Sequence, residues 1–316
     1  MPGATSEHGP AIELQRILVP VDFSPASKDG LTFAGALADR FRSRLHLLHV
    51  IEPPGLPEWG YAHLARRDVK LRRAAEKKLP KLPSECGIDP GLIVGAEICA
   101  GEAEDAICNA AARVRADVIV LASHGLGGLR HAVFGSTAER VVRRAPCPVL
   151  TVRERVLRNK SAGINLFELK RLFVTTDFSS ESKKAFPYAA ALGRMFHSSL
   201  TLVYVVPGQL PAELSHIGIV LEQRRLMEEA RKHLPPFARA EFAPDLDIDT
   251  RVLNGGSAHE ICRMAAMQGA DLIIMATHGH TGLKHFLVGS VTENVVRHAP
   301  CPVLVVRERE NDFVKG

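Results

Sequence analysis

The chain alternates between two patterns of hydrophobic residues. Short apolar runs rich in β-branched residues predict buried strands, and longer stretches between them have the spacing of amphipathic helices. The strands are predicted at residues 17–21, 45–50, 92–98, 118–121 and 149–152, and again at 172–175, 200–205, 249–253, 272–275 and 303–306. Helices are predicted at 24–41, 62–79, 103–114 and 136–144, and between the strands of the second half. This alternation predicts an α/β fold with a parallel sheet covered on both faces.

The two halves of the chain repeat one another. Residues 123–155 and 277–309 are nearly the same passage, and both keep His-Gly, Gly-Ser and Ala-Pro-Cys-Pro. The match extends from residues 16–50 to 171–205 and from 100–125 to 254–279. Because the chain of 316 residues suits two domains of about 150 residues each, the repeat is a duplicated domain. The predicted boundaries are a tail at 1–15, domains at 16–153 and 171–308, a linker at 154–170 and a tail at 309–316.

The composition is that of a soluble globular protein, with 46% hydrophobic and 24% charged residues. The net charge of +5 does not predict a nucleic-acid partner, because no stretch interleaves basic and aromatic residues. The first residues lack a signal-peptide profile, and no apolar run reaches the roughly 18 residues of a membrane span. The six cysteines include no CxxC pair, which favours buried thiols in a reducing cytoplasm over disulfides. We therefore expect a cytoplasmic protein with no membrane partner.

A ligand site is expected where the strands end, since ligands of such sheets bind at the carboxyl ends of the strands. Ser136 to Glu139 and Ser290 to Glu293 both spell S-x-x-E, which predicts a capping box at a helix start. A glycine precedes each serine, so the helix N-terminus can face the crevice and bind an anion. Gly125 and Gly279 allow a tight turn beneath the same anion. The alternative is that these glycines and serines only turn a loop and cap a helix.

The end of the first strand in each half carries an acidic residue but no familiar nucleotide signature. No G-x-G-x-x-G follows either strand, and no P-loop G-x-x-x-x-G-K-[ST] occurs in the chain. Asp22 and Asp177 stand there, beside the helix-opening Ser24 and Ser179. A carboxylate in that place can accept hydrogen bonds from ribose hydroxyls or help to hold a metal. Its alternative role is a local turn and helix-cap contact.

Four ordered motifs, each present twice, resemble the universal stress protein family. They are Ile17–Ser24, Leu47–Val50, Ala122-x2-Gly125-x9-Gly135-Ser136 and Cys147–Val152 in the first half, and Leu172–Ser179, Leu202–Val205, Ala276-x2-Gly279-x9-Gly289-Ser290 and Cys301–Val306 in the second. The chain thus resembles a tandem universal stress protein throughout, apart from its tails and linker. The resemblance implies two Rossmann-like domains of the adenine nucleotide hydrolase-like type. Each would hold a five-stranded parallel sheet, and the two would pair as an intramolecular pseudo-dimer that could itself dimerise.

The resemblance also implies a ligand, which is ATP or a related adenine nucleotide such as ADP or AMP, with Mg²⁺ as a candidate companion. The aspartate would lie near the ribose, the end of the second strand near adenine, and the glycine-rich loop around the phosphates. The candidate nucleotide-binding residues are Pro20, Val21, Asp22, Ser24, Val50, Ala122, His124, Gly125, Gly128, Gly135, Ser136 and Thr137 in the first half, and Thr175, Thr176, Asp177, Ser179, Val205, Ala276, His278, Gly279, Gly282, Gly289, Ser290 and Val291 in the second.

Two features depart from the family pattern. Ala122 and Ala276 stand where the first glycine of the motif is expected, and their methyl groups fit only if the backbone there has a negative φ. Pro20-Val21 becomes Thr175-Thr176, so the two halves are expected to differ in affinity.

Three classes of function follow. The first is a nucleotide-binding regulatory protein of the stress response, and the second is a slow ATPase. The third is a nucleotide-free dimerising scaffold, favoured if the two alanines close the pocket. The sequence assigns no catalytic residues, so any hydrolysis is expected to be slow. No metal site is predicted either, because the counterpart of His278-Gly-His280 is His124-Gly-Leu126.

Overall fold

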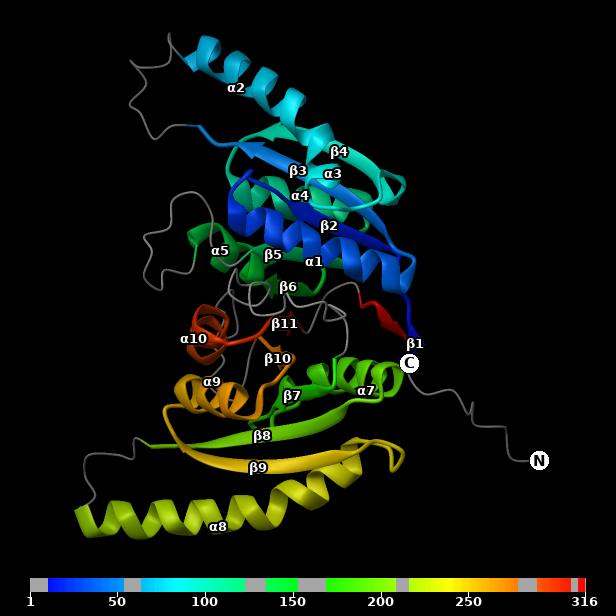
Figure 1. Cartoon of the computed structure of the whole chain (residues 1–316). Coiled ribbons are helices and arrows are strands. Elements are labelled where there is room, and N and C mark those ends of the chain that lie inside the picture. The colour runs from blue at the N-terminus through cyan, green and yellow to red at the C-terminus, as the bar shows by residue number, and fades with distance from the viewer. Residues whose placement is uncertain are drawn as a thin grey trace. The chain divides into compact units, whose positions relative to one another are not determined.

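A computed structural model describes residues 11–53, 64–122, 135–152, 169–208, 216–277, 289–307 and 312–315 of the chain (Figure 1). The described residues divide into two compact units. One unit, called here the first domain, holds residues 14–152 of the described ranges. The other, the second domain, holds residues 11–13, 169–307 and 312–315. The predicted linker lies outside the described residues except for 169 and 170, so the predicted domain boundaries stay predictions.

The first domain is built on five parallel strands. They are β2 (Arg16–Pro20), β3 (Arg44–Ile51), β4 (Ile93–Ala100), β5 (Val118–Ala122) and β6 (Val149–Val152), in the spatial order β4-β3-β2-β5-β6. β5 is wholly apolar, Thr151 is the one polar residue of β6, and both strands lie almost entirely buried, which agrees with a sheet covered on both faces. The predicted α/β architecture is confirmed.

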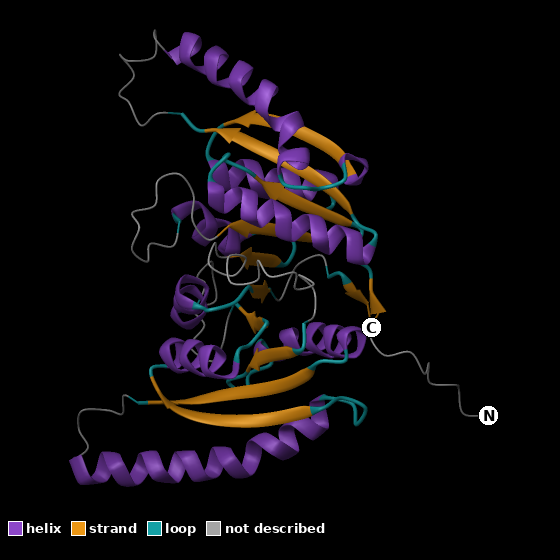
Figure 2. Ribbon diagram, in the orientation of Figure 1, coloured by secondary structure: helices purple, strands orange, loops and turns teal. Residues whose placement is uncertain are grey.

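Helices flank this sheet (Figure 2). They are α1 (Pro25–Phe41), α2 (Leu64–Lys78), α3 (Leu82–Glu85), α4 (Ala103–Val114) and α5 (Ser136–Arg144), with short 3₁₀ turns η2 (Leu79–Lys81) and η3 (Pro90–Leu92). α1 begins where Ser24 accepts a hydrogen bond from the Ser27 amide, and proline follows at its first position. It ends at Arg42, which adopts a left-handed conformation.

The second domain repeats this plan. Its parallel strands are β7 (Arg171–Thr175), β8 (Ser199–Pro207), β9 (Ile248–Gly255), β10 (Leu272–Ala276) and β11 (Val303–Val306), in the order β9-β8-β7-β10-β11. Its helices are η4 (Ser182–Ala185), α7 (Phe186–Phe196), α8 (His216–Glu241), α9 (Ser257–Gln268) and α10 (Ser290–His298). The main difference is α8, which continues through Pro235 and Pro236 where the first domain breaks into α2, η2 and α3.

Two further strands form a small antiparallel ribbon in the second domain. β1 (Ala11–Ile12) pairs with β12 (Val314–Lys315), although the sequence places both in terminal tails. Asp312 accepts hydrogen bonds from Tyr188 and Lys184 of the α7 region, at 2.6 Å each. The ring of Phe313 packs edge-on against Tyr188, and both residues are buried. These contacts join the two ends of the described chain to the second domain.

None of the six cysteines, all of which lie in the described ranges, forms a disulfide. Cys147 and Cys301 are buried, as expected of thiols in apolar elements. The expectation of burial is wrong for the other four, because Cys86, Cys99, Cys108 and Cys262 are half-buried. Cys99 lies near the end of the edge strand β4, and Cys108 and Cys262 lie on helix faces that the sheets do not cover fully.

An aspartate holds the start of the first strand in each domain. Asp117 accepts hydrogen bonds from the backbone amides of Gln15 and Arg16, at 2.8 and 2.7 Å. Asp271 accepts in the same way from the amides of Lys170 and Arg171, at 3.0 and 2.9 Å. The duplication is therefore visible in individual hydrogen bonds. Each carboxylate fixes the point at which the chain enters the centre of the sheet.

We predict that Asp117→Ala lowers the free energy of unfolding by about 2 kcal/mol, because two amides lose a charged acceptor. Urea unfolding followed by circular dichroism measures the change. Asp39→Ala, on the exposed side of α1, is the matched control and should change stability by less than about 0.5 kcal/mol. Equal effects of the two variants would contradict the assigned role of Asp117.

Candidate functional site

The order of the strands fixes where a ligand crevice can form. In the second domain the chain leaves β7 towards β8 on one side and later returns to β10 on the other side. The carboxyl ends of β7 and β10 therefore diverge at a topological switch point, where open α/β sheets bind their ligands. β2 and β5 form the equivalent point of the first domain.

A cleft lies at this point of the second domain. It has a volume of about 140 Å³ and is lined by the ends of β7, β8 and β10 and by the first turns of α9 and α10. Eight of the predicted residues come together in it, namely Thr175, Thr176, Asp177, Val205, Ala276, Gly289, Ser290 and Val291. Ser179 does not line the cleft. The predicted His278, Gly279 and Gly282 lie outside the described residues.

Sequence reasoning missed eight residues that also line the cleft. They are Ser182, Val203, Tyr204, Ser257, Ile261, Met275, Thr277 and Thr292. Two of them had a signal in the sequence, since Thr277 opens the repeated passage and Ser257 follows a Gly-Gly pair at a helix start. No sequence signal pointed to Tyr204. Its counterpart in the first half is His49, so a comparison of the two halves shows no functional group common to this position.

The start of α10 differs from the predicted capping box. Gly289 is the N-cap residue, Ser290 is already the first helical residue, and no side chain of the described residues caps the helix. Glu293 bonds to Arg297 one turn later, at 3.0 Å, and so does not reach back to the cap. The same correction applies to α5, where Gly135 is the N-cap and Glu139 bonds to Arg143 at 2.7 Å. The capping-box prediction is therefore wrong for both helices.

This correction has a consequence for anion binding. A capping box would have used the serine hydroxyl to satisfy one of the first amides of the helix. Because no described side chain caps α10, the backbone amides of Ser290, Val291 and Thr292 remain hydrogen-bond donors at the edge of the cleft. Such donors, together with the positive end of the helix dipole, favour a negatively charged group.

The first turn of α10 is bonded to the end of β10. The Gly289 amide donates to the Thr277 carbonyl at 2.8 Å, and the Thr292 hydroxyl donates to the Ala276 carbonyl at 2.9 Å. A Cβ atom at position 289 would lie 3.3 Å from the Thr277 oxygen, which is a tight contact. A glycine is thus favoured where the strand end and the helix start approach one another. The first domain has Ala138 in the place of Thr292 and lacks this hydroxyl.

The two aspartates make local turns. Asp22 accepts from the Ser24 amide at 2.9 Å, and Asp177 accepts from the Ser179 amide at 3.0 Å. The residue between the aspartate and the serine is a phenylalanine in both domains. Phe23 has a φ of 63° and Phe178 a φ of 65°, so each turn holds a bulky residue in the left-handed region. The local-turn alternative is therefore observed for both, and Asp177 in addition lines the cleft.

In the second domain, aromatic side chains pack around Phe178 in the turn that follows Asp177. The ring of Phe178 lies 4.7 Å from Tyr204 and 5.0 Å from Phe237 between centroids. Burial, and then the negative charge of Asp177, raise the pKa of Tyr204, so its hydroxyl stays protonated at neutral pH. In the first domain His49 replaces this tyrosine and stacks on Phe23 at 4.5 Å. Its Nδ1 donates to the Val21 carbonyl at 2.8 Å.

The two alanines that replace the first glycine of the family motif fit their positions. Ala122 ends β5 and Ala276 ends β10, and neither has a positive φ. An L-residue is therefore accommodated at both without backbone strain. In the first domain Gly30 of α1 lies directly over Ala122, since a Cβ atom on Gly30 would lie 3.7 Å from the Ala122 methyl.

The remaining predicted residues of the first domain occupy equivalent places. Pro20 ends β2, Val21 is buried, and Val50 lies near the end of β3. Thr137 is the second residue of α5, directly after Ser136. His124, Gly125 and Gly128 lie outside the described residues.

Comparison with known proteins decides the family. The sequence profile described as the universal stress protein family matches residues 13–153 and 168–307. The chain belongs to the universal stress protein family. It is 35% identical over 161 residues to a universal stress protein of Methanocaldococcus jannaschii, an alignment that covers 50% of this chain and 90% of the relative. Membership of this family supports a role in the stress response.

Solved structures show the same fold. A universal stress protein from Archaeoglobus fulgidus superposes with a TM-score of 0.62 at 20% identity, covering 93% of this chain and 99% of that protein. A protein of unknown function from Pseudomonas aeruginosa superposes with a TM-score of 0.58 at 17% identity, covering 96% and 94%. At such identities the likeness concerns the fold alone. It confirms the α/β fold, whereas the tandem arrangement of two universal stress protein domains follows from the two profile matches.

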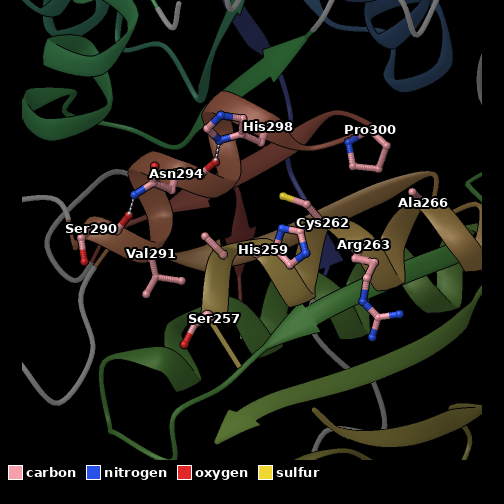
Figure 3. Close-up of a pocket in the computed structure, with 12 residues that line it drawn as sticks. Ser257, His259, Cys262, Arg263, Ala266, Ser290, Val291, Asn294, His298 and Pro300 are labelled. Atoms are coloured by element: carbon pink, nitrogen blue, oxygen red, sulfur yellow. Dashed lines mark hydrogen bonds between the residues drawn. The ribbon is translucent and has the colours of Figure 1, made fainter. Parts of the chain in front are cut away.

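The two domains of this universal stress protein differ beside their sites. In the first domain two ion pairs bridge α4 and α5, Glu104 with Arg140 at 2.7 Å and Asp105 with Arg144 at 2.6 Å. The four equivalent positions of the second domain are Ala258, Asn294, His259 and His298. An open groove of about 740 Å³ lies between α9 and α10 there, with Cys262 and the two histidines on its walls (Figure 3).

Other classes of site find no support in the described ranges. No group of three or more His, Cys, Asp or Glu side chains there could hold a metal ion. None of the helices in the same ranges combines the length and the apolar composition that crossing a bilayer requires.

The Glu104–Arg140 pair predicts a pH dependence. Burial by itself would raise the pKa of Glu104, but the hydrogen bond and the charge of Arg140 outweigh it and lower this pKa. The pair therefore stabilises the first domain above the ordinary glutamate pKa of about 4.3, and this contribution is lost as the pH falls through the lowered value.

We predict that Glu104→Gln reduces stability at pH 7 and reduces the loss of stability between pH 5 and pH 3. Urea unfolding at a series of pH values measures both effects. The exposed Asp39 of α1 supplies the control variant Asp39→Asn, which should keep the wild-type pH profile. An unchanged acid profile for Glu104→Gln would refute the role of the pair.

Proposed function

We propose that this universal stress protein binds ATP or a related adenine nucleotide in at least one domain, and that binding regulates a protective role in the stress response. The observation that carries the proposal is the cleft of the second domain. Eight residues, chosen from the sequence for nucleotide binding, converge there from three strand ends and a helix start.

The phosphates are assigned to the start of α10. Its first amides lack a side-chain cap among the described residues, and the positive end of the helix dipole lies with them at the cleft. Gly289 keeps the backbone close to the end of β10, and a larger residue would press on the Thr277 oxygen. The residues present therefore fit a negatively charged phosphate tail.

The nucleoside is assigned to the other wall. Asp177 lines this part of the cleft, and its carboxylate, which accepts from the amide and the hydroxyl of Ser179, is assigned to the ribose hydroxyls. Val203, Tyr204 and Val205 of β8 line this wall of the cleft, and their side chains are assigned to the adenine ring. Mg²⁺ enters the proposal only as a companion of the phosphates, because the described residues contain no group of three or more His, Cys, Asp or Glu side chains that could hold a metal ion.

The two domains are not expected to bind equally. Thr175 and Thr176 line the second cleft, and the Thr176 hydroxyl bonds to Ser182 and to the Phe178 amide. The first domain has Pro20 and Val21 at these positions, which carry no hydroxyl. We therefore assign the tighter site to the second domain.

Mass spectrometry of the purified protein after denaturation tests the proposal first. We expect ATP, ADP or AMP to be released, and a turnover assay then separates binding from hydrolysis. Protein that releases no nucleotide and shows no binding of added ATP by calorimetry would support the nucleotide-free scaffold and contradict the proposal.

We further predict that Gly289→Glu weakens nucleotide binding about 100-fold. The loss of two charge-assisted hydrogen bonds accounts for about 3 kcal/mol. Calorimetry measures the affinity, and thermal unfolding checks that the fold is kept. Met267→Glu, at the opposite end of α9, adds the same charge at an exposed position and should leave binding unchanged. Undiminished binding by Gly289→Glu would reject the assignment of the phosphate site, and Gly135→Glu would then test the first domain.

A further inference from the structure

Helix α2 and the turn after it concentrate the positive charge of the chain. Residues 64–81 contain eight Lys and Arg residues and two acidic residues, a net charge of +6, whereas the whole chain carries +5. The equivalent helix of the second domain, α8 at residues 216–241, contains five Lys and Arg residues and four acidic ones. The excess charge is therefore a property of α2 and not of the duplicated fold.

Three cations of α2 lie on its outer face. Within residues 67–81 Ala75 and Leu79 are buried, and they fix the side of the helix that faces the domain. Lys70, Arg73 and Lys77 follow one another at spacings of three and four residues, so they form one stripe along the opposite side. All three are exposed. α2 lies beside β3 and β4 at the edge of the sheet (Figure 1), and no other described helix or strand of the domain packs on this side of it.

These three cations have no ion-pair partner among the described residues. Other helix cations do form ion pairs, as Arg225 does with Glu229 on α8 and Arg113 does with Glu97 beside α4. Like charges three and four residues apart on one helix repel each other. The stripe therefore lowers the stability of the isolated helix, and an anionic partner would relieve the repulsion.

The stripe borders apolar surface. A groove of about 400 Å³ runs along the helix and is lined by Val69, Lys70, Arg73, Ala74 and Lys77. Val69 is 51% exposed and lies beside the three cations, so its side chain can be covered by a partner. A phosphate backbone gains nothing from covering Val69, whereas a protein segment with an apolar side chain does. The described part of α2 also has no aromatic residue on which a nucleic-acid base could stack.

We propose that the outer face of α2 is a docking surface for an acidic segment of a partner protein. The partner places carboxylates against Lys70, Arg73 and Lys77 and an apolar side chain against Val69. A bilayer fits the surface less well, because Val69 and Leu71 point to different sides of the helix and do not form one apolar face. This surface is separate from the nucleotide cleft, since no residue lines both.

The test uses the full chain and two fluorescent 18-residue peptides. One repeats Glu-Glu-Leu and the other repeats Glu-Glu-Ser, so that they carry the same charge. Fluorescence anisotropy at 50 and 300 mM salt measures binding. We expect the leucine peptide to bind about tenfold more tightly than the serine peptide, and both to weaken at the higher salt.

Charge reversal locates the binding surface. The triple variant Lys70→Glu, Arg73→Glu and Lys77→Glu should weaken binding of the leucine peptide about 100-fold. The matched control reverses three exposed cations of α8, Arg224, Arg231 and Lys232, and should keep wild-type affinity. Val69→Ser should remove the preference for the leucine peptide and keep the affinity for the serine peptide.

Three outcomes would overturn the proposal. They are equal loss of binding in the α2 and α8 variants, equal affinity of the wild-type chain for both peptides, and tighter binding of a 12-base-pair DNA duplex or of phosphatidylserine vesicles than of the leucine peptide. Circular dichroism of each variant checks that the helices are retained, and the Val69→Ser result stands even if the triple variant unfolds.

Discussion

The parallel direction of the strands is the constraint on which the rest of this structure depends. Because all five strands of a domain end at the same edge, the loops and helix starts that follow them must converge there. The switch between β7 and β10 opens a gap in that edge, and the first turn of α10 lies at the gap. The backbone amides of this turn, which no described side chain caps, are the hydrogen-bond donors that can bind an anion in the gap. The candidate site is therefore made largely by the fold and only partly by side chains.

Duplication preserved this frame and changed its surroundings. The aspartates that hold the first strands, the turn at Asp22 or Asp177, and the glycine N-caps are the same in both domains. The residues around them differ. Tyr204 replaces His49 beside the turn, and the ion pairs between α4 and α5 have no equivalent between α9 and α10. Two sites with one backbone design can thus differ in affinity, and the charged face of α2 occurs in one domain only.

The fold was largely predictable because buried strands and amphipathic helices leave strong periodic patterns. α4, α5, β6 and β11 lie at their predicted positions, and other predicted elements differ mainly by one to three residues at an end. The ribbon of β1 and β12 was not predictable, because two-residue strands have no period. The capping-box prediction was wrong because the glutamate of each S-x-x-E also begins an E-x-x-x-R pattern. In both helices this glutamate bonds to the arginine one turn later and not to the start of the helix. Tyr204 was missed because its counterpart in the first half is His49, so the repeat shows no shared chemistry at this position.

The central claim is that backbone donors at the start of α10 bind the phosphates of an adenine nucleotide. A crystal structure of the chain grown with excess ATP and Mg²⁺ tests it most directly. The account predicts phosphate density within hydrogen-bond distance of the Ser290 and Val291 amides, with adenine against the end of β8. An empty second-domain cleft in which side chains occupy the place of the phosphates would contradict it.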